Sequence, residues 1–237
     1  GWIKFLVKAF ANGRKIDNLQ IAKWAVETEV NFFKQAGGIM DQYTISIGGL
    51  MMIDTAKKTY EKLQGNLGSL LVIDSGQPKN TQGVLSKAKG NAQEAIKYVK
   101  RVNKDFDLLK STKHDYKKYL NDIPVNLRDY WESTILNYEI TKSAIKLLKK
   151  VNSPINDLGQ LMNSHQYLLE NNIKNTPFQL TKQMKKALSA GAVGAKIVGS
   201  GGGGCMVVMV DENNIPRVKK SILSAGAKNV FKVKITN

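Results

Sequence analysis

The chain has 237 residues, with 36 Lys and Arg against 19 Asp and Glu, and a formal net charge of +17 at pH 7. Its 42% hydrophobic and 23% charged residues are typical of a globular protein with a real core. No apolar run reaches the ~18 residues of a membrane span, and the start, "GWIKFLVKAFANGRK", lacks the apolar core of a signal peptide. The single cysteine, Cys205, excludes an internal disulfide and argues against a zinc site built from Cys and His. We therefore expect a cytoplasmic protein without a membrane segment.

The lysine-rich clusters are dispersed along the chain. "KYVKR", "KLLKK", "KQMKK" and "RVKK" fall in separate predicted helices, as solvated helix faces do. Lys far outnumbers Arg in these clusters, whereas recognition of bases favours Arg. The charge therefore favours an enzyme that binds an anionic small molecule over a nucleic-acid-binding protein.

The N-terminal third mixes predicted helices and strands. Apolar spacing predicts a helix over residues 2–11, which ends at the cap signal "NG", and a second helix over residues 19–36. "YTISIGGLMMID" alternates and is rich in β-branched residues, which predicts two short strands around its glycine pair, and "SLLVIDSG" predicts another strand. The buried side of the second helix is expected to carry Ile21, Trp24, Ala25, Phe32 and Phe33.

The rest of the chain is rich in predicted helices. Helical patterns cover residues 84–103, 105–120, 127–151, 155–170 and 178–190, and are followed by a strand at 195–198, a strand at 205–210, a helix at 216–225 and the strand "NVFKVKI". The texture changes near residue 80, which predicts a boundary between domains 1–80 and 81–237. The predicted fold class is α+β.

The stretch "KIVGSGGGGCMVVMV" places four consecutive glycines, Gly201–Gly204, between two predicted strands. A flexible linker would have polar flanks and would join two autonomous domains, but too little chain follows here to form one. Glycines between strands indicate tight curvature and close approach to another group, and successive N–H groups of a turn can bind an anion. The pattern is neither a P-loop nor a dinucleotide fingerprint. A functional or closely packed loop is therefore favoured over a linker.

Acidic residues stand near the first glycine pair. Asp41 follows that pair in "GGIMDQY", and Glu27 and Glu29 lie within the preceding predicted helix. A carboxylate between a helix and a strand is either a turn-former or a general base that orients a hydroxyl. An acidic side chain on the packed side of a helix needs a cation, a metal ion or a ligand. We expect one of the two glutamates to be solvated, which leaves the other as the candidate for such a partner.

Two further segments carry polar residues that could belong to a site. "DSGQPKNT", residues 74–81, ends a predicted strand and opens a predicted helix. This arrangement indicates either a plain capped turn or an N-cap beside a cleft. His165 falls in the middle of a predicted helix, where a lone histidine is usually structural or exposed.

In this order the segments resemble the GHMP small-molecule kinase superfamily, which includes galactokinases and mevalonate kinases. "GGIMDQ" is similar to the galactokinase segment "CGIMDQ", with Gly37 in place of the cysteine, and "KIVGSGGGGC" resembles the glycine-rich third motif of the superfamily. "DSGQPKNTQGVL" and "LMNSHQYLL" resemble further segments of its members. The resemblance covers about residues 16–210. It implies a two-part fold: the remainder of a ribosomal protein S5 domain 2-like N-terminal domain and a helix-rich, ferredoxin-like C-terminal domain.

The resemblance also implies an activity. Members transfer the γ-phosphate of ATP to an alcohol group with the help of Mg²⁺, which makes a sugar and ATP the expected substrates, in carbohydrate metabolism. By position, Asp41 matches the catalytic aspartate that orients or deprotonates the acceptor hydroxyl, Glu29 matches the magnesium-binding glutamate, and Thr81 matches a threonine near the substrate hydroxyls. The other implied site residues are Gly38, Gly201 and Gly202 at the substrate, and Gly199, Ser200, Gly203 and Gly204 in the loop beside the nucleotide.

Two departures from the family pattern leave alternatives open. The phosphate-binding loop of the form P-x-x-x-G-L-[GS]-S-S does not occur in this sequence. We therefore expect an N-terminally incomplete chain that is inactive by itself and lacks a segment or relies on a complementary chain. "GVLSKAK" stands where galactokinases carry "Y-N-x-R-R", which leaves the particular sugar open. The alternatives are a mevalonate kinase, against which "MDQ" argues, and a non-catalytic ligand-binding or regulatory homologue, which the missing loop favours.

Overall fold

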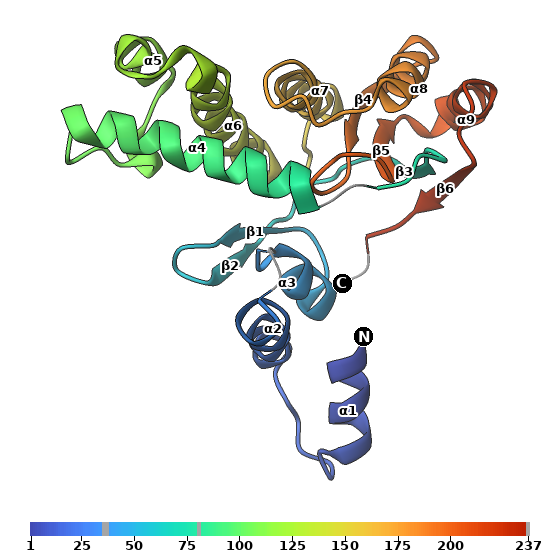
Figure 1. The fold of residues 1–237 in the computed structure, drawn as a ribbon. Coiled ribbons are helices and arrows are strands. Elements are labelled where there is room, and N and C mark those ends of the chain that lie inside the picture. Colours follow the sequence, from blue (N-terminus) through green and yellow to red (C-terminus); the bar gives the residue numbers. More distant parts are fainter. Residues whose placement is uncertain (35–37, 80–81, 236–237) are drawn as a thin grey trace. The chain divides into compact units, whose positions relative to one another are not determined.

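The computed structural model describes residues 1–34, 38–79 and 82–235. The chain divides into two compact units: unit 1 is Gly1–Gly65 with Ile235–Asn237, and unit 2 is Asn66–Lys234. Figure 1 labels the helices and strands of both and colours them by residue number. Both units contain helices and strands, which confirms the predicted α+β class. The predicted family domains, 1–80 and 81–237, divide the chain in a different way and stay a prediction.

Unit 1 is built from three helices and a β-hairpin. The helices are α1 (Trp2–Phe10), α2 (Asn18–Val26), which continues into a π-helical turn (Glu27–Phe32), and α3 (Met40–Ile47). Strands β1 (Met51–Asp54) and β2 (Thr59–Lys62) pair in antiparallel fashion. The helices predicted over residues 2–11 and 19–36 are thus confirmed up to Phe10 and Phe32 respectively, and α1 ends before the "NG" signal.

The segment "YTISI" forms helix α3, so the strand predicted there is wrong. Tyr43 and Ile47 lie one helical turn apart, and both are buried in the core of unit 1 with Ala22 and Val26. The Thr44 hydroxyl donates to the Met40 carbonyl, as it does within a helix. A short apolar run fits the strand period and the helix period equally well, so burial of one helical face decided between them. The second strand predicted in this region is confirmed as β1.

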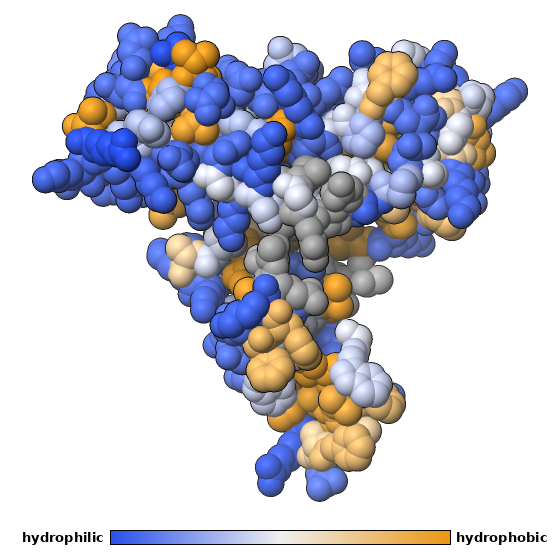
Figure 2. All heavy atoms as spheres, viewed as in Figure 1, coloured by the Kyte–Doolittle hydropathy of each residue, from blue (hydrophilic) through white to orange (hydrophobic). Residues whose placement is uncertain are grey.

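The predicted buried face of α2 is wrong in part. Ile21 is buried as expected, but Trp24, Phe32 and Phe33 are 41%, 75% and 63% exposed. The π-helical turn explains the change for the two phenylalanines, because its wider spacing shifts the residues that follow it out of the 3.6-residue period. Figure 2 shows apolar side chains gathered over α1 as well. The exposed apolar residues of that helix are Trp2, Phe5, Leu6 and Phe10.

Unit 2 contains a four-stranded antiparallel sheet. Its strands are β3 (Ser69–Asp74), β4 (Ala192–Ile197), β5 (Cys205–Val210) and β6 (Asn229–Val233), in the order β4-β5-β3-β6. One face packs on α8 (Phe178–Ser189) and α9 (Ile215–Ser224). That core includes Leu71, Val208, Leu180, Met184 and Ile222. All four strands confirm the sequence prediction, with β4 beginning earlier than expected.

The remaining helices of unit 2 are α4 (Gln82–Val102), α5 (Lys113–Lys118), α6 (Arg128–Leu148) and α7 (Ile155–Asn171), with short 3-10 turns between α4 and α6. The single helix predicted over 105–120 is wrong, because two capping residues interrupt it. The Asp107 side chain accepts from the Leu109 N–H and starts one of those turns. Thr112 and Asp115 then form a capping box that starts α5.

Helix α7 lies along the edge of strand β4. The Asn163 side chain accepts from the Ala195 N–H at 3.0 Å and donates to the Val193 carbonyl at 3.1 Å. The Gln166 side chain accepts from the Ile197 N–H at 3.0 Å. These bonds satisfy edge groups that would otherwise lack a strand partner, so α7 holds β4 in place.

Candidate functional site

The acidic residues of unit 1 come from two neighbouring elements. Asp41 is exposed in the first turn of α3, where a helix N-terminus favours negative charge. Gln42, the next residue, is 7% exposed, and its Nε2 donates to Glu29 Oε2 at 2.8 Å. Glu29 lies in the π-helical turn after α2. The Gln42 side chain therefore joins the turn that carries Glu29 to the helix that carries Asp41.

The two glutamates of that turn differ in their partners. Both are exposed, so the solvated position applies to both and neither lies on the packed side of the helix. Glu27 accepts from Asn31 within the same turn, whereas Glu29 accepts from Gln42 in α3. Only Glu29 is thereby tied to the segment "GGIMDQ". Within that segment, Gly38 is exposed with open space around it, and Gly37 lies outside the described residues.

Glu29 and Asp41 suit a magnesium ion whose other ligands are phosphate oxygens and water better than an ion that protein side chains enclose completely. In the described part of the chain, no group of three or more His, Cys, Asp or Glu side chains is placed to hold a metal ion. Mg²⁺ commonly takes one or two carboxylates and completes its shell with phosphate oxygens and water. Glu29 and Asp41 offer carboxylates of that kind. The Gln42 Oε1 atom is also buried without a hydrogen-bond partner among the described residues.

In unit 2 the glycine loop joins β4 to β5 and is packed closely. The Gly202 N–H donates to the Asn175 carbonyl at 2.7 Å, and the Gly204 N–H donates to the Gln77 carbonyl at 3.0 Å. The Asn175 side chain donates to the Ser200 carbonyl at 3.0 Å. The loop is therefore an ordered turn, held by hydrogen bonds to neighbouring segments, and not a flexible linker. Because two of its N–H groups are already bonded within the protein, they are not free to bind an anion.

Glycine is required in this loop by contact and by conformation. A Cβ atom on Gly203 would lie 2.0 Å from the Pro78 carbonyl oxygen, and one on Gly201 would lie 2.6 Å from the Asn175 carbonyl oxygen. Their φ angles, 123° and 79°, are also ones that other residues rarely adopt. The loop thus lies against the segment that follows β3.

The turn after β3 is anchored by buried polar residues. Ser75 is fully buried; its N–H and hydroxyl both donate to the Gly204 carbonyl, and its hydroxyl accepts from the Gln77 N–H. The Gln183 side chain, fully buried in α8, donates to the Ser75 carbonyl at 3.1 Å. The segment "DSGQPK" is therefore more than a plain turn, because it packs against the glycine loop and is hydrogen-bonded to it. Thr81 lies outside the described residues.

Lys79 is a candidate residue that the sequence reasoning missed. Its Nζ atom lies 3.3 Å from the position a Cβ atom on Gly199 would take, and its stem lies against Gly204. The side chain therefore places a positive charge on the glycine loop. The only sequence signal was the lysine in "DSGQPK", and nothing local indicated that this segment meets the loop.

His165 in α7 and Lys196 in β4 are two partly buried basic groups whose charges interact. Burial lowers the pKa of Lys196. Burial and then the Lys196 charge lower the pKa of His165 to about 4 from its ordinary 6.5. His165 is thus neutral at pH 7 and structural in character, as the sequence position indicated.

We expect acid to destabilise the protein through His165. The unfolded chain binds a proton at this residue below pH 6.5, whereas the folded protein does so only near pH 4. The contribution of neutral His165 to the free energy of unfolding is therefore fully present above pH 6.5. It is lost as the pH drops from 6.5 to 4, which lowers the free energy of unfolding by about 3 kcal/mol. Urea unfolding of the His165→Gln variant across this range should show a smaller loss than the wild type. His114→Gln, at an exposed histidine in α5, should leave the loss unchanged.

No helix among the described residues has the length and apolar character needed to cross a bilayer. The expected cytoplasmic location stays a prediction.

Comparison with known proteins gives a family match and a set of relatives. Residues 144–228 match the family model described as GHMP kinases C terminal. A galactokinase of Limosilactobacillus reuteri (strain DSM 20016) is 29% identical over 216 residues, which is 87% of this chain and 54% of that protein. A galactokinase of Clostridium perfringens (strain SM101 / Type A) is 26% identical over 229 residues, which is 93% of this chain and 58% of that protein. The chain thus spans about half the length of the curated relatives it matches.

Solved structures show the same fold. The galactokinase of Lactococcus lactis complexed with galactose has a TM-score of 0.84 at 19% identity, covering 98% of this chain and 62% of that one. The mevalonate kinase of Methanococcus jannaschii has a TM-score of 0.62 at 18% identity, covering 95% of this chain and 59% of that one. At these identities the likeness is one of fold.

Proposed function

We propose that the chain, which matches the GHMP kinase C-terminal family model and resembles galactokinases in sequence, is the larger part of a galactokinase-like sugar kinase of the GHMP superfamily, which transfers the γ-phosphate of ATP to a sugar hydroxyl. One observation carries the proposal. In unit 1 the segment "GGIMDQ" is bonded through Gln42 to Glu29, so that the predicted catalytic carboxylate, Asp41, and the predicted magnesium ligand, Glu29, come from joined elements. Sequence likeness to galactokinases over 87% of the chain supports a sugar as the acceptor.

Asp41 is the proposed catalytic residue. Its carboxylate is exposed, and none of the residues described here donates a hydrogen bond to it. It is therefore available to accept the hydrogen of a substrate hydroxyl, which orients that oxygen and increases its nucleophilicity. Phosphoryl transfer requires little more from the protein than such positioning and the stabilisation of charge.

Glu29 is the proposed ligand of Mg²⁺. When bound, the ion neutralises charge on the transferred phosphate. The side-chain amide of Gln42 donates through Nε2 to one carboxylate oxygen of Glu29 and fixes its orientation, while the other oxygen stays available. Gln42 is held in turn by burial in the core of unit 1.

The glycine loop and Lys79 are proposed to shape the nucleotide and substrate region of unit 2. Lys79 contributes a positive charge that attracts phosphate, and the close packing of the loop keeps its backbone rigid. Gly38, Thr81, Gly201 and Gly202 remain proposed substrate contacts, and Gly199, Ser200, Gly203 and Gly204 remain proposed elements of the cleft.

The proposal is tested by ADP release from the natural gene product with MgATP and a panel of acceptors. The panel contains galactose, glucose, mannose, N-acetylgalactosamine and mevalonate. We expect turnover with galactose or another sugar and none with mevalonate. Turnover with mevalonate alone would replace the proposal with a mevalonate kinase. Binding of a sugar without any turnover would favour a regulatory homologue.

The metal assignment is tested by a matched pair of glutamates. Glu29→Gln should raise the Mg²⁺ concentration needed for half-maximal turnover by about tenfold or more, because a carboxylate ligand is lost. Glu27→Gln removes the same charge two residues away, from a side chain bonded only within its own turn. It should leave the Mg²⁺ requirement unchanged. If the two variants raised the Mg²⁺ requirement equally, Glu29 would act only through its negative charge and not as a ligand of the ion.

A further inference from the structure

Helices α6 and α7 of unit 2 leave an open groove between them. Its volume is about 550 Å³, within the size range of small-molecule sites. The groove is lined on α6 by Glu132, Leu136, Glu139, Ile140 and Ser143, and on α7 by Leu161, Asn163, Ser164, Tyr167 and Leu168, with Lys113 at the start of α5. The spacing of the α6 residues places them on one face of that helix. Nothing in the proposed kinase function uses this groove.

The groove is apolar in its walls and carries few available polar groups. Leu136, Ile140, Leu161 and Leu168 supply aliphatic side chains, and Tyr167 adds an aromatic ring. Asn163 is not available to a ligand, because both ends of its amide are bonded to the edge of β4. The charged groups of the lining are the two carboxylates of α6 and the ammonium of Lys113.

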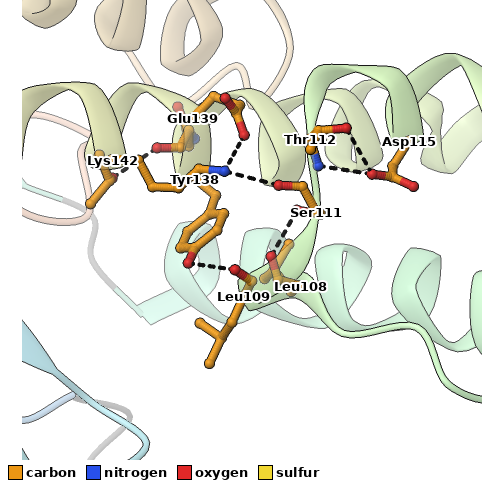
Figure 3. A network of polar contacts seen from close by, with 10 residues as sticks. Leu108, Leu109, Ser111, Thr112, Asp115, Tyr138, Glu139 and Lys142 are labelled. Atoms are coloured by element: carbon orange, nitrogen blue, oxygen red, sulfur yellow. Dashed lines mark hydrogen bonds and ion pairs between the residues drawn. The ribbon is translucent and has the colours of Figure 1, made fainter.

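One of the two carboxylates is already neutralised. Glu139 forms an ion pair with Lys142, whose Nζ also donates to the Ser111 carbonyl at 2.9 Å. Figure 3 shows this network, in which the Tyr138 hydroxyl also donates to the Leu109 carbonyl at 2.9 Å. The contacts hold Leu109 and Ser111, just before α5, against α6. These contacts therefore hold this wall of the groove in a defined structure.

The second carboxylate, Glu132, is not neutralised. Its Oε2 accepts from the Asn172 side chain at 3.0 Å, and it forms no ion pair with any residue in the described part of the chain. It is partly buried, so its charge is less screened than that of an exposed group. A carboxylate without an ion pair beside apolar walls is complementary to a cation.

We propose that this groove binds a small organic cation, a primary amine attached to an apolar or aromatic body. The amine pairs with Glu132, and the body lies against Leu136, Ile140 and Leu161. Lys113 is exposed at the rim, where its flexible side chain can turn into solvent. The site is independent of the proposed kinase chemistry.

The proposal is tested by calorimetric titration of the whole chain with tryptamine and with indole-3-propionate. The two probes share the indole body and differ in the sign of their charge. Tryptamine should bind at least about fivefold more tightly, which is the effect of one moderately screened ion pair. Glu132→Gln, which keeps an oxygen that accepts from Asn172, should remove that preference. Ser143→Trp, which places a large side chain in the groove, should abolish binding of both probes.

The matched control is Glu170→Gln, which removes the same charge from α7 outside the groove lining. It should leave the affinity for tryptamine unchanged, and each variant's thermal melting is measured to confirm that it is folded. Equal affinity for the two probes, or an equal loss in Glu132→Gln and Glu170→Gln, would overturn the proposal. Undiminished binding to Ser143→Trp would place the ligand elsewhere and overturn it as well.

Discussion

Asp41→Asn should lower the turnover of the natural gene product by about 10²–10⁴-fold, which is the usual contribution of a general base. The substitution keeps the size and shape of the side chain and removes its charge. Asp41 is exposed and is not part of the core of unit 1, so the variant should fold like the wild type. Turnover is measured by ADP release at saturating sugar and MgATP, and folding by circular dichroism.

Asp17→Asn is the matched control for this variant. Asp17 is exposed at the start of α2 in the same unit, and its side chain makes no cap hydrogen bond. The same change of charge there should leave turnover within about twofold of the wild type, as a distant surface charge does. If Asp41→Asn keeps near-normal turnover while a sugar is still phosphorylated, the catalytic residue is misassigned although the kinase function stands.

Gly203→Ala should destabilise unit 2 by about 3 kcal/mol or more, as unrelieved strain and a steric clash do. The new Cβ would lie 2.0 Å from the Pro78 carbonyl oxygen, and the φ angle of 123° is unfavourable for alanine. The contact is with backbone, so no side chain can rotate to relieve it. Separation of the loop from residues 75–79 would also break the bond from the Gly204 N–H to Gln77. Urea unfolding followed by circular dichroism measures the effect.

Gly90→Ala provides the comparison. Gly90 lies in the interior of α4 with open space around the position of a Cβ atom. Alanine there should stabilise the protein by roughly 0.5–1 kcal/mol, because it lowers the conformational entropy of the unfolded chain. If Gly203→Ala instead unfolds at the same urea concentration as the wild type, the close contact between the loop and Pro78 is not maintained in solution.

The sequence predicted best those elements whose apolar pattern fits one period alone. Strands β3 and β5 are continuous apolar runs of strand length, and α7 and α8 carry a clear helical spacing. The apolar pattern failed where it fits both the helix period and the strand period, as in "YTISI". It also failed where the backbone departs from a regular α-helix. The π-helical turn after α2 and the caps at Asp107 and Thr112 are local departures of this kind. Their effect depends on hydrogen bonds that a hydropathy pattern does not contain.

By itself the sequence determined the kinds of residue available for chemistry and their order, because carboxylates, glycines and motif spacing are covalent properties of the chain. It identified Asp41, Glu29 and the glycine loop as candidates. Only the tertiary structure decided which groups meet them. Ser75 and Gly204 are separated by 129 residues, and they bond because β3 pairs with β5 in the sheet. Gln42 reaches Glu29, and Lys79 covers the loop, for the same reason: packing of distant elements sets these contacts, and no local pattern records it.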